Sequence, residues 1–215
     1  RNSQMVNHTP LGNHIYYCNK KIIKRESMTT GKRLYTKYGD EGQTSLLYGG
    51  RVSKSDLHCE AYGATDEACS ALGLSRALSK DANVTEMLKE LQRQLFAVGA
   101  ELASEPDKYE TFKQHFSPIT AEMTAQLEPK IDYYQDSVTL PRSFILPGAS
   151  PASAAMDMAR TSIRRAEREA VRLMEAGRLT NLEIIRYLNR LGDLLFIVAR
   201  YEDRDLPLDK LTGDD

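Results

Sequence analysis

The sequence lacks the features that mark membrane, secreted and nucleic-acid-binding proteins. Its 215 residues include no tryptophan, and no apolar run approaches the length that spans a bilayer. The three cysteines, Cys18, Cys59 and Cys69, have an odd count and no paired spacing, which favours free thiols in a reducing compartment. A net charge of −1 lacks the basic excess expected of a nucleic-acid-binding protein. We therefore expect neither a membrane nor a nucleic-acid partner.

Metal-binding patterns are also missing from the sequence. The four histidines are scattered, and neither HxxxH nor CxxC occurs, so we do not expect a dedicated zinc site. The chain has an ordinary globular composition, with 41% hydrophobic and 27% charged residues. Its length suits one domain with a sizeable core.

The first 31 residues differ from the rest of the chain. They contain five basic residues against a single acid, Glu26, and show no sustained apolar period. Two interpretations remain open. The stretch is either a disordered tail or expression remnant, or the remains of a mitochondrial targeting segment, which would be basic and poor in acids. We expect the folded domain to occupy residues 32–215.

Helical periodicity dominates from Leu57 onwards and predicts five helices. The first begins near Leu57. The second is predicted to start at a capping box formed by Asn83 and Glu86. The third opens at Ser117 and must end or kink at Pro129.

The last two helices have strong start and stop signals. Ser150 is predicted to cap the fourth helix, and Gly177 to stop it. Thr180 and Glu183 are predicted to form the capping box of the fifth, with Leu182 facing inward. Residues 33–45 and 137–146 are expected to be extended or looped. Five helices with short connections predict an all-α bundle.

Three arginines of the fourth helix, Arg160, Arg164 and Arg168, recur every four residues and so share one face. A solvated surface would explain a charge run of this kind, with Arg165 paired to Glu169. However, like charges at this spacing repel unless an anion lies across them, and the arginine fork matches phosphate oxygens in pairs. The stripe therefore favours a polyphosphate ligand.

A glycine-containing loop offers a second phosphate-binding feature. It combines backbone N–H groups, hydroxyls and a cation in the following residues: Thr36, Lys37, Gly39, Gly42, Thr44 and Ser45. The loop lacks the Gly-Lys-Ser/Thr ending of a P-loop, and an ordinary turn would also explain it.

Single residues elsewhere leave two interpretations open. Asp66 is either a surface carboxylate or the partner of an arginine on the fourth helix. Asn189 shares a face with Asp193 and either contacts a nucleotide or links helices. Phe144 by default belongs to the core. None of these residues names a function alone.

Taken in order, six segments resemble the PduO-type ATP:cob(I)alamin adenosyltransferases. They are Tyr-Thr-Lys-Tyr-Gly-Asp-Glu-Gly at 35–42 with Thr-Ser at 44–45, Arg-Val-Ser-Lys-Ser-Asp at 51–56, Glu-Ala-Tyr-Gly-Ala-Thr-Asp-Glu at 60–67, Phe-Ile-Leu-Pro-Gly at 144–148, Ala-Arg-Thr at 159–161 with Arg-Arg-Ala-Glu-Arg at 164–168, and Tyr-Leu-Asn-Arg-Leu at 187–191. The resemblance covers residues 32–203.

The resemblance implies a transferase that forms adenosylcobalamin. Such an enzyme moves the 5′-deoxyadenosyl group of ATP to the cobalt of cob(I)alamin, made by reducing cob(II)alamin, and releases triphosphate. It also implies Mg²⁺ bound through the ATP phosphates, and a homotrimer of five-helix bundles with active sites between subunits.

The same resemblance assigns residues to the site. The implied ATP contacts are Thr36, Lys37, Gly39, Asp40, Gly42, Thr44, Ser45, Lys54, Arg160, Arg164, Arg165, Glu167, Arg168 and Asn189. The implied catalytic positions are Phe144, Asp66, Arg160 and Arg164. Phe144 would lie on the lower face of the corrin, and Asp66 would hold Arg160 by a salt bridge at the subunit interface.

A non-catalytic carrier that delivers cobalamin to a B12-dependent enzyme is the alternative function, and a purely structural trimer would bind no ATP. Binding alone would not require Asp66, Phe144, Arg160 and Asn189 together, which favours catalysis. A reductase and a B12-dependent acceptor enzyme are the protein partners that catalysis would imply. The expected compartment is the mitochondrial matrix for a eukaryotic source and the cytoplasm otherwise.

Overall fold

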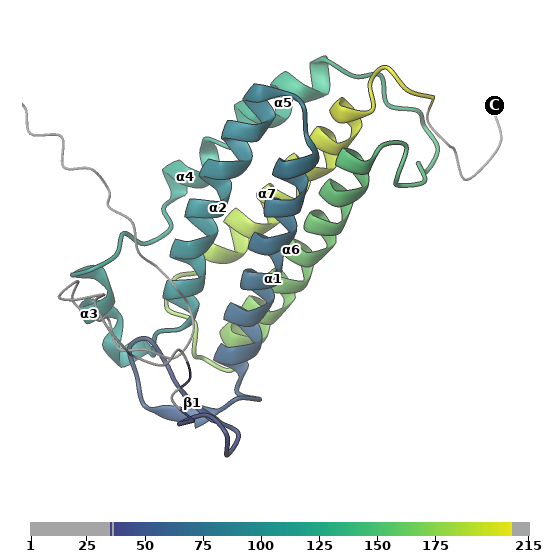
Figure 1. Cartoon of the computed structure of the whole chain (residues 1–215). Helices are drawn as coiled ribbons and strands as arrows, with labels where there is room; N and C mark the ends of the chain where they lie inside the picture. Colours follow the sequence, from purple (N-terminus) through teal and green to yellow (C-terminus); the bar gives the residue numbers. More distant parts are fainter. Residues whose placement is uncertain (1–34, 36, 208–215) are drawn as a thin grey trace, which may run out of the picture.

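The computed structural model describes residue 35 and residues 37–207 (Figure 1). Four long helices form the body: α1 (Leu57–Leu78), α2 (Ala82–Leu102), α6 (Pro151–Glu175) and α7 (Glu183–Glu202). Helix α1 packs against α2 and α6, and α7 packs against α6 and reaches α2 through the Tyr187–Gln94 hydrogen bond, which closes the bundle. The predicted all-α bundle is confirmed. The predicted tail at 1–31 and the loop residue Thr36 lie outside the described residues.

Small side chains line the contact between α1 and α6. The buried stripe of α6 is rich in alanine, including Ala155, Ala159, Ala166 and Ala170, and α1 contributes Ala61, Ala64 and Ala68. Because the distance between packed helices depends on the side chains at the contact, alanine lets these two helices approach closely. The larger core residues, such as Leu88 and Tyr187, come from α2 and α7.

The predicted ends of α6 are confirmed. The Ser150 hydroxyl accepts a hydrogen bond from the Ser153 backbone N–H at 3.1 Å, and the Ser153 hydroxyl accepts one from the Ser150 backbone N–H at 3.2 Å. Gly177 has φ of 69°, the left-handed conformation that glycine adopts at a helix end.

The predicted caps of α2 and α7 are wrong. Asp81 caps α2 in place of Asn83, because its Oδ1 accepts from the N–H groups of Asn83 at 2.9 Å and Val84 at 3.2 Å. Leu182 is the N-cap residue of α7, and the Asn181 Oδ1 one position earlier accepts from the Glu183 N–H at 3.0 Å, so Thr180 is not the cap. Leu182, predicted to face inward, is 48% exposed.

The predicted third helix is two pieces, α4 (Ala121–Ala125) and α5 (Glu128–Asp136). Thr120 caps α4, so that helix begins later than Ser117. The predicted helix is interrupted just before Pro129, close to where we expected it to end or kink, and Pro129 lies in the first turn of the next helix, α5, where its missing N–H removes no helical hydrogen bond. The 3₁₀ turn η1 (Pro106–Lys108) and helix α3 (Tyr109–Lys113) were not predicted.

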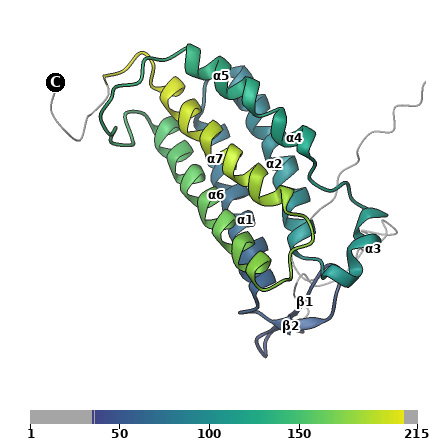
Figure 2. The same cartoon turned by 180° about the vertical axis from the view of Figure 1, so that it is seen from behind.

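The two ends of the bundle carry different loops. At one end, strand β1 (Gln43–Ser45), in the segment expected to be extended or looped, pairs antiparallel with β2 (Arg51–Ser53). At the other end, residues 137–150 connect α5 to α6 without a helix (Figure 2). None of the helices within residues 37–207 has both the length and the apolar character needed to cross a membrane.

Candidate functional site

The arginine stripe of α6 lies on the outer surface of the bundle, between α1 and α7. Arg164 and Arg168 are exposed, and no ion pair with a carboxylate involves either of them within the described chain. The Nη1 of Arg168 donates instead to the Arg164 backbone oxygen at 3.2 Å. Two guanidinium groups without counter-charges therefore stand one turn apart, which is a favourable arrangement for a polyphosphate.

The neighbouring charges on α6 do form ion pairs, but not the predicted ones. Arg165 pairs with Glu67 of α1, across the helix contact. Glu169 pairs with Arg172, at 3.0 Å between Oε2 and Nη1. The predicted pair of Arg165 with Glu169 is therefore wrong, because each residue has another partner.

Asn189 links α7 to the arginine helix. Its Nδ2 donates to Glu167 Oε1 at 3.0 Å. Beside it, Gly192 lies against Arg164, because a Cβ placed there would lie 3.8 Å from the Arg164 Cγ. The structure thus shows the helix-linking contact of Asn189, and it brings Asn189, Glu167 and Arg164 into one neighbourhood.

The hairpin brings Lys54 over the glycine loop. The Lys54 N–H donates to the Gly42 backbone oxygen at 2.9 Å. The Lys54 Nζ would lie 3.1 Å from a Cβ at Gly39, so the ammonium group passes directly over that glycine. Lys37 and Gly42 both adopt positive φ, 61° and 77°, which turns the loop back on itself. Of the remaining predicted ligands, Asp40 and Ser45 are exposed and Thr44 is buried.

An ion pair anchors the hairpin to the bundle. Asp56 follows β2 and caps α1, accepting from the His58 N–H at 2.9 Å. Arg178, just after α6, donates through Nη2 to both oxygens of Asp56 at 2.9 Å and 3.1 Å. The side chain of His58 has a structural role. Its ring is buried, its Nδ1 lies 2.6 Å from the Leu102 carbonyl oxygen, and burial lowers its pKa, so it is not suited to act as a catalytic base.

Asp66 and Phe144 do not have the contacts expected of them from the sequence within one chain. Asp66 is exposed on α1, and no ion pair involves it among the described residues; Arg160 instead bonds to Asp157 of its own helix. Phe144 is 80% exposed, so its default assignment to the core is wrong.

The predicted site is spread along the bundle. The hairpin lies at one end, and the loop that carries Phe144 lies at the other (Figures 1 and 2). Arg160 lies between them, separated from the hairpin end of α6 by 15 residues, roughly 22 Å of helix. One chain does not bring these groups together.

Two buried polar clusters were missed from the sequence. Asp157 joins Arg160 and Arg200, and the spacing of Asp157 three residues before Arg160 could have indicated the first of these contacts. Glu101 accepts from Tyr109, Ile119 and Asn181, at 2.5, 3.0 and 2.8 Å, and so joins the start of α3 to the segments that precede α4 and α7. Only the fold brings those partners together.

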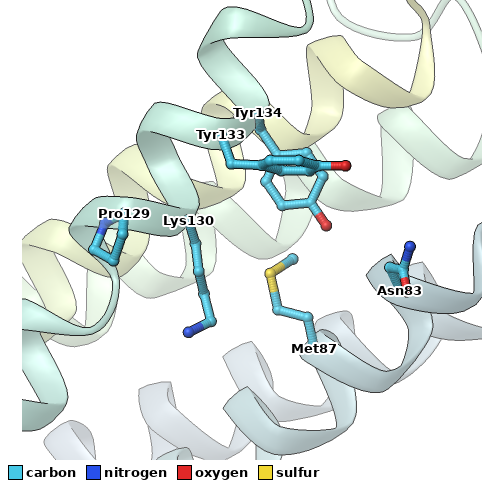
Figure 3. A pocket seen from close by; sticks show the side chains of 6 residues that line it. All are labelled: Asn83, Met87, Pro129, Lys130, Tyr133 and Tyr134. Atoms are coloured by element: carbon cyan, nitrogen blue, oxygen red, sulfur yellow. The ribbon is translucent and has the colours of Figure 1, made fainter.

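A groove of about 300 Å³ lies elsewhere, between α2 and α5 (Figure 3). It is lined by Asn83, Met87, Pro129, Lys130, Tyr133 and Tyr134. None of these residues belongs to the predicted site. In the part of the chain that the structure describes, no three His, Cys, Asp or Glu side chains gather as metal ligands.

The geometry defines a helical bundle with an exposed arginine face on α6 and a glycine loop that carries Lys54. The sequence profile of the family described as cobalamin adenosyltransferase matches residues 34–202, and the chain belongs to this family. The corrinoid adenosyltransferase PduO of Citrobacter freundii is 42% identical over 172 residues, which are 80% of this chain and 50% of that protein. The chain thus spans about half the length of that relative.

Other relatives are matched over nearly their whole length. A corrinoid adenosyltransferase of Citrobacter freundii is 40% identical over 173 residues, 80% of this chain and 95% of that protein. Among solved structures, a variant PduO-type ATP:corrinoid adenosyltransferase from Lactobacillus reuteri, complexed with cobalamin and ATP, superposes with a TM-score of 0.77. The two sequences are 34% identical, and the superposition covers 84% of this chain and 100% of the Lactobacillus reuteri chain.

Proposed function

We propose that this chain transfers the 5′-deoxyadenosyl group of ATP to the cobalt of cob(I)alamin, forming adenosylcobalamin and releasing triphosphate. The observation that carries the proposal is the face of α6 on which Arg164 and Arg168 stand without carboxylate partners in the described chain. Family membership and the similar structure that contains cobalamin and ATP support it.

The chemistry requires charge stabilisation rather than proton transfer. The cobalt of cob(I)alamin is a strong nucleophile that attacks the 5′ carbon of ATP, and negative charge grows on the departing triphosphate. Arg164 and Arg168 stabilise that charge, and Lys54 above the glycine loop adds a further cation. Mg²⁺ bound with the ATP phosphates would supply further charge neutralisation, and the exposed oxygens of Asp40 and Ser45 are ligands that suit it.

Asn189, Glu167 and Arg165 hold the phosphate-binding face in shape. The Asn189–Glu167 hydrogen bond fixes α7 against α6, and the Arg165–Glu67 ion pair fixes α1 against α6. The Arg165–Glu67 pair also engages the Glu67 carboxylate, so that this carboxylate does not pair with Arg164 or Arg168. The nucleotide then binds to a surface whose charge is already oriented, which is the basis of electrostatic catalysis.

Phe144 supplies an apolar surface for the corrin. A ring that is 80% exposed gains little from the fold of its own chain, so it is available to a ligand. Against the lower face of the corrin it would exclude water and the lower base. Cobalt without a lower axial ligand is easier to reduce to cobalt(I), so Phe144 would assist the step before transfer.

The working enzyme is a homotrimer with its sites between subunits. The groups that one chain holds apart, the hairpin at one end and Phe144 at the other, come together when neighbouring chains meet. Exposed apolar side chains on α6 itself and on its neighbour α1, Met158 and Leu74, suit such a contact. Asp66 of one subunit would pair with Arg160 of the next.

A cofactor carrier is the second candidate, because a chain that binds ATP and cobalamin could deliver the product directly. A reductase that supplies cob(I)alamin and a B12-dependent acceptor enzyme would then be partners. In a eukaryotic source the mitochondrial matrix would be the compartment. A carrier would bind and deliver the cofactor without forming adenosylcobalamin from ATP, and this difference separates it from the enzyme.

Product analysis tests the proposed reaction. Incubated without oxygen with chemically reduced cobalamin, ATP and Mg²⁺, the protein should form adenosylcobalamin and intact triphosphate in equal amounts, measured by chromatography. Arg164→Ala should lower kcat/KM by about a hundredfold or more, the loss typical of one transition-state donor. Arg172→Ala, on the same helix but paired with Glu169, should stay within about twofold. Formation of ADP or phosphate in place of triphosphate would refute the reaction.

A further inference from the structure

A single buried carboxylate joins the arginine face to the interior of the bundle. Asp157 lies on α6, one turn before Arg160, and its side chain is 6% exposed. Its Oδ1 accepts from the Arg160 Nε at 3.0 Å, and its Oδ2 accepts from Arg200 of α7. One carboxylate therefore holds two guanidinium groups, one inside the bundle and one facing the site.

Arg200 keeps that carboxylate from turning. The Arg200 side chain is 2% exposed and stacks over the Phe196 ring, 5.6 Å from its centroid. A buried guanidinium is costly unless it is paired, and within the described chain its Nε has no hydrogen-bond partner. The pair with Asp157 is thus strongly favoured, and it fixes both oxygens of the carboxylate.

The fixed carboxylate in turn sets the orientation of Arg160. An arginine side chain has several rotatable bonds, so an untethered guanidinium samples many positions. Bonding through Nε removes most of that freedom, yet leaves the Nη groups at the end of the fork able to donate. Arg160 is only 26% exposed at its side chain, consistent with a guanidinium held against the helix.

We propose that Asp157 is a positioning residue for Arg160 in the adenosyl transfer, with Arg200 as its buried support. This inference rests on the proposed role of Arg160. Asp157 touches neither substrate: it holds the Arg160 fork so that Nη1 and Nη2 face a phosphate or the carboxylate of a neighbouring subunit. Arg160 thus enters the reaction already oriented.

A double-mutant cycle separates positioning from general support of the fold. Asp157→Asn should lower kcat/KM by about tenfold or more when Arg160 is present, since small displacements of a binding group are costly. In the background of Arg160→Lys, which has a cation but no Nε, Asp157→Asn should change kcat/KM by less than about twofold. Equal losses in both backgrounds would show a merely structural role and overturn the proposal.

Two further variants guard against unfolding. Asp157→Asn leaves Arg200 buried without a counter-charge, so the combined replacement Asp157→Leu with Arg200→Met removes both charges and should keep the fold. It should still lose about tenfold in kcat/KM; wild-type activity would overturn the proposal. Glu169→Gln breaks an i,i+3 pair on the same helix and should stay within about twofold. If Glu169→Gln lowers kcat/KM as much as Asp157→Asn does, the proposal is also overturned.

The outcome for Asp157 is separable from the outcome for the reaction. If the unsubstituted chain forms no adenosylcobalamin, the proposed function is wrong. The four proteins of the double-mutant cycle (the unsubstituted chain, Asp157→Asn, Arg160→Lys and the double variant) are then compared by their ATP affinity, measured by calorimetry. Loss of affinity on Asp157→Asn only where Arg160 is present supports the positioning role, and equal loss in both backgrounds refutes it.

Discussion

Replacing Asp56 should separate two contributions to the attachment of the hairpin. The Asp56 carboxylate caps α1 through the His58 N–H and also receives Arg178, whose Nη2 lies 2.9 Å and 3.1 Å from its two oxygens. Asp56→Ala removes both interactions. Asp56→Asn keeps an oxygen that can cap the helix but removes the charge that attracts Arg178.

The magnitudes follow from these contacts. Loss of an N-cap costs about 1 kcal/mol. The ion pair, with side chains 34% and 19% exposed, is worth about 1 kcal/mol. We therefore expect Asp56→Ala to lower the free energy of unfolding by about 2 kcal/mol, or roughly 4–8 °C in Tm, and Asp56→Asn to lower it by about half as much.

Urea unfolding followed by far-UV circular dichroism measures both changes. Arg178→Met should match Asp56→Asn, because each removes the ion pair and keeps the cap. Asp132→Ala, at an exposed carboxylate of α5, should change stability by less than about 0.5 kcal/mol. If Asp56→Asn is as damaging as Asp56→Ala, or Arg178→Met has no effect, the division into cap and ion pair is wrong.

Three further predictions concern the site and the core. Arg160→Ala should abolish adenosylcobalamin formation in the absorbance assay, and unchanged turnover would remove Arg160 from the mechanism. Phe144→Ala should change the free energy of unfolding by less than about 0.5 kcal/mol, since the ring is 80% exposed, but should slow turnover that starts from cob(II)alamin. Burial raises the pKa of Glu101 above its ordinary value of 4.5. The protonated Glu101 side chain therefore contributes fully to the stability of the fold below pH 4.5, and this contribution is lost as the pH rises through the raised pKa. Glu101→Gln should remove this slope from urea midpoints measured between about pH 4 and about pH 7, and a persisting slope would exclude Glu101 as its source.

The sequence predicted structure well where the cause is local. Ser150 and Gly177 bound α6 as expected, because a cap hydroxyl and a left-handed glycine act on the backbone beside them. The start of α2 was misplaced because Asp81 and Asn83 are both good caps, and Asp81 also accepts from the Tyr201 hydroxyl of α7, a contact that sequence periodicity does not show. Pro129 was ambiguous for a similar reason, since it can end one helix or begin the next.

Tertiary contacts explain the larger misses. Arg165 has a suitable partner four residues on, yet it pairs with Glu67 because the alanine-lined contact brings α1 beside α6. Asp157 bonds to Arg200, 43 residues away, a distance over which periodicity carries no information. Neither Asp66 nor Phe144 has a local pattern that indicates a role, so only the resemblance to a family suggested one, and both roles remain proposals.

The most direct test of adenosyl transfer is an anaerobic absorbance measurement with chemically reduced cobalamin, ATP and Mg²⁺. We predict that the cob(I)alamin spectrum gives way to that of light-sensitive adenosylcobalamin only when the protein is present. If ATP and cobalamin both bind while the cob(I)alamin spectrum persists, the chain is a carrier and the proposed catalysis is contradicted.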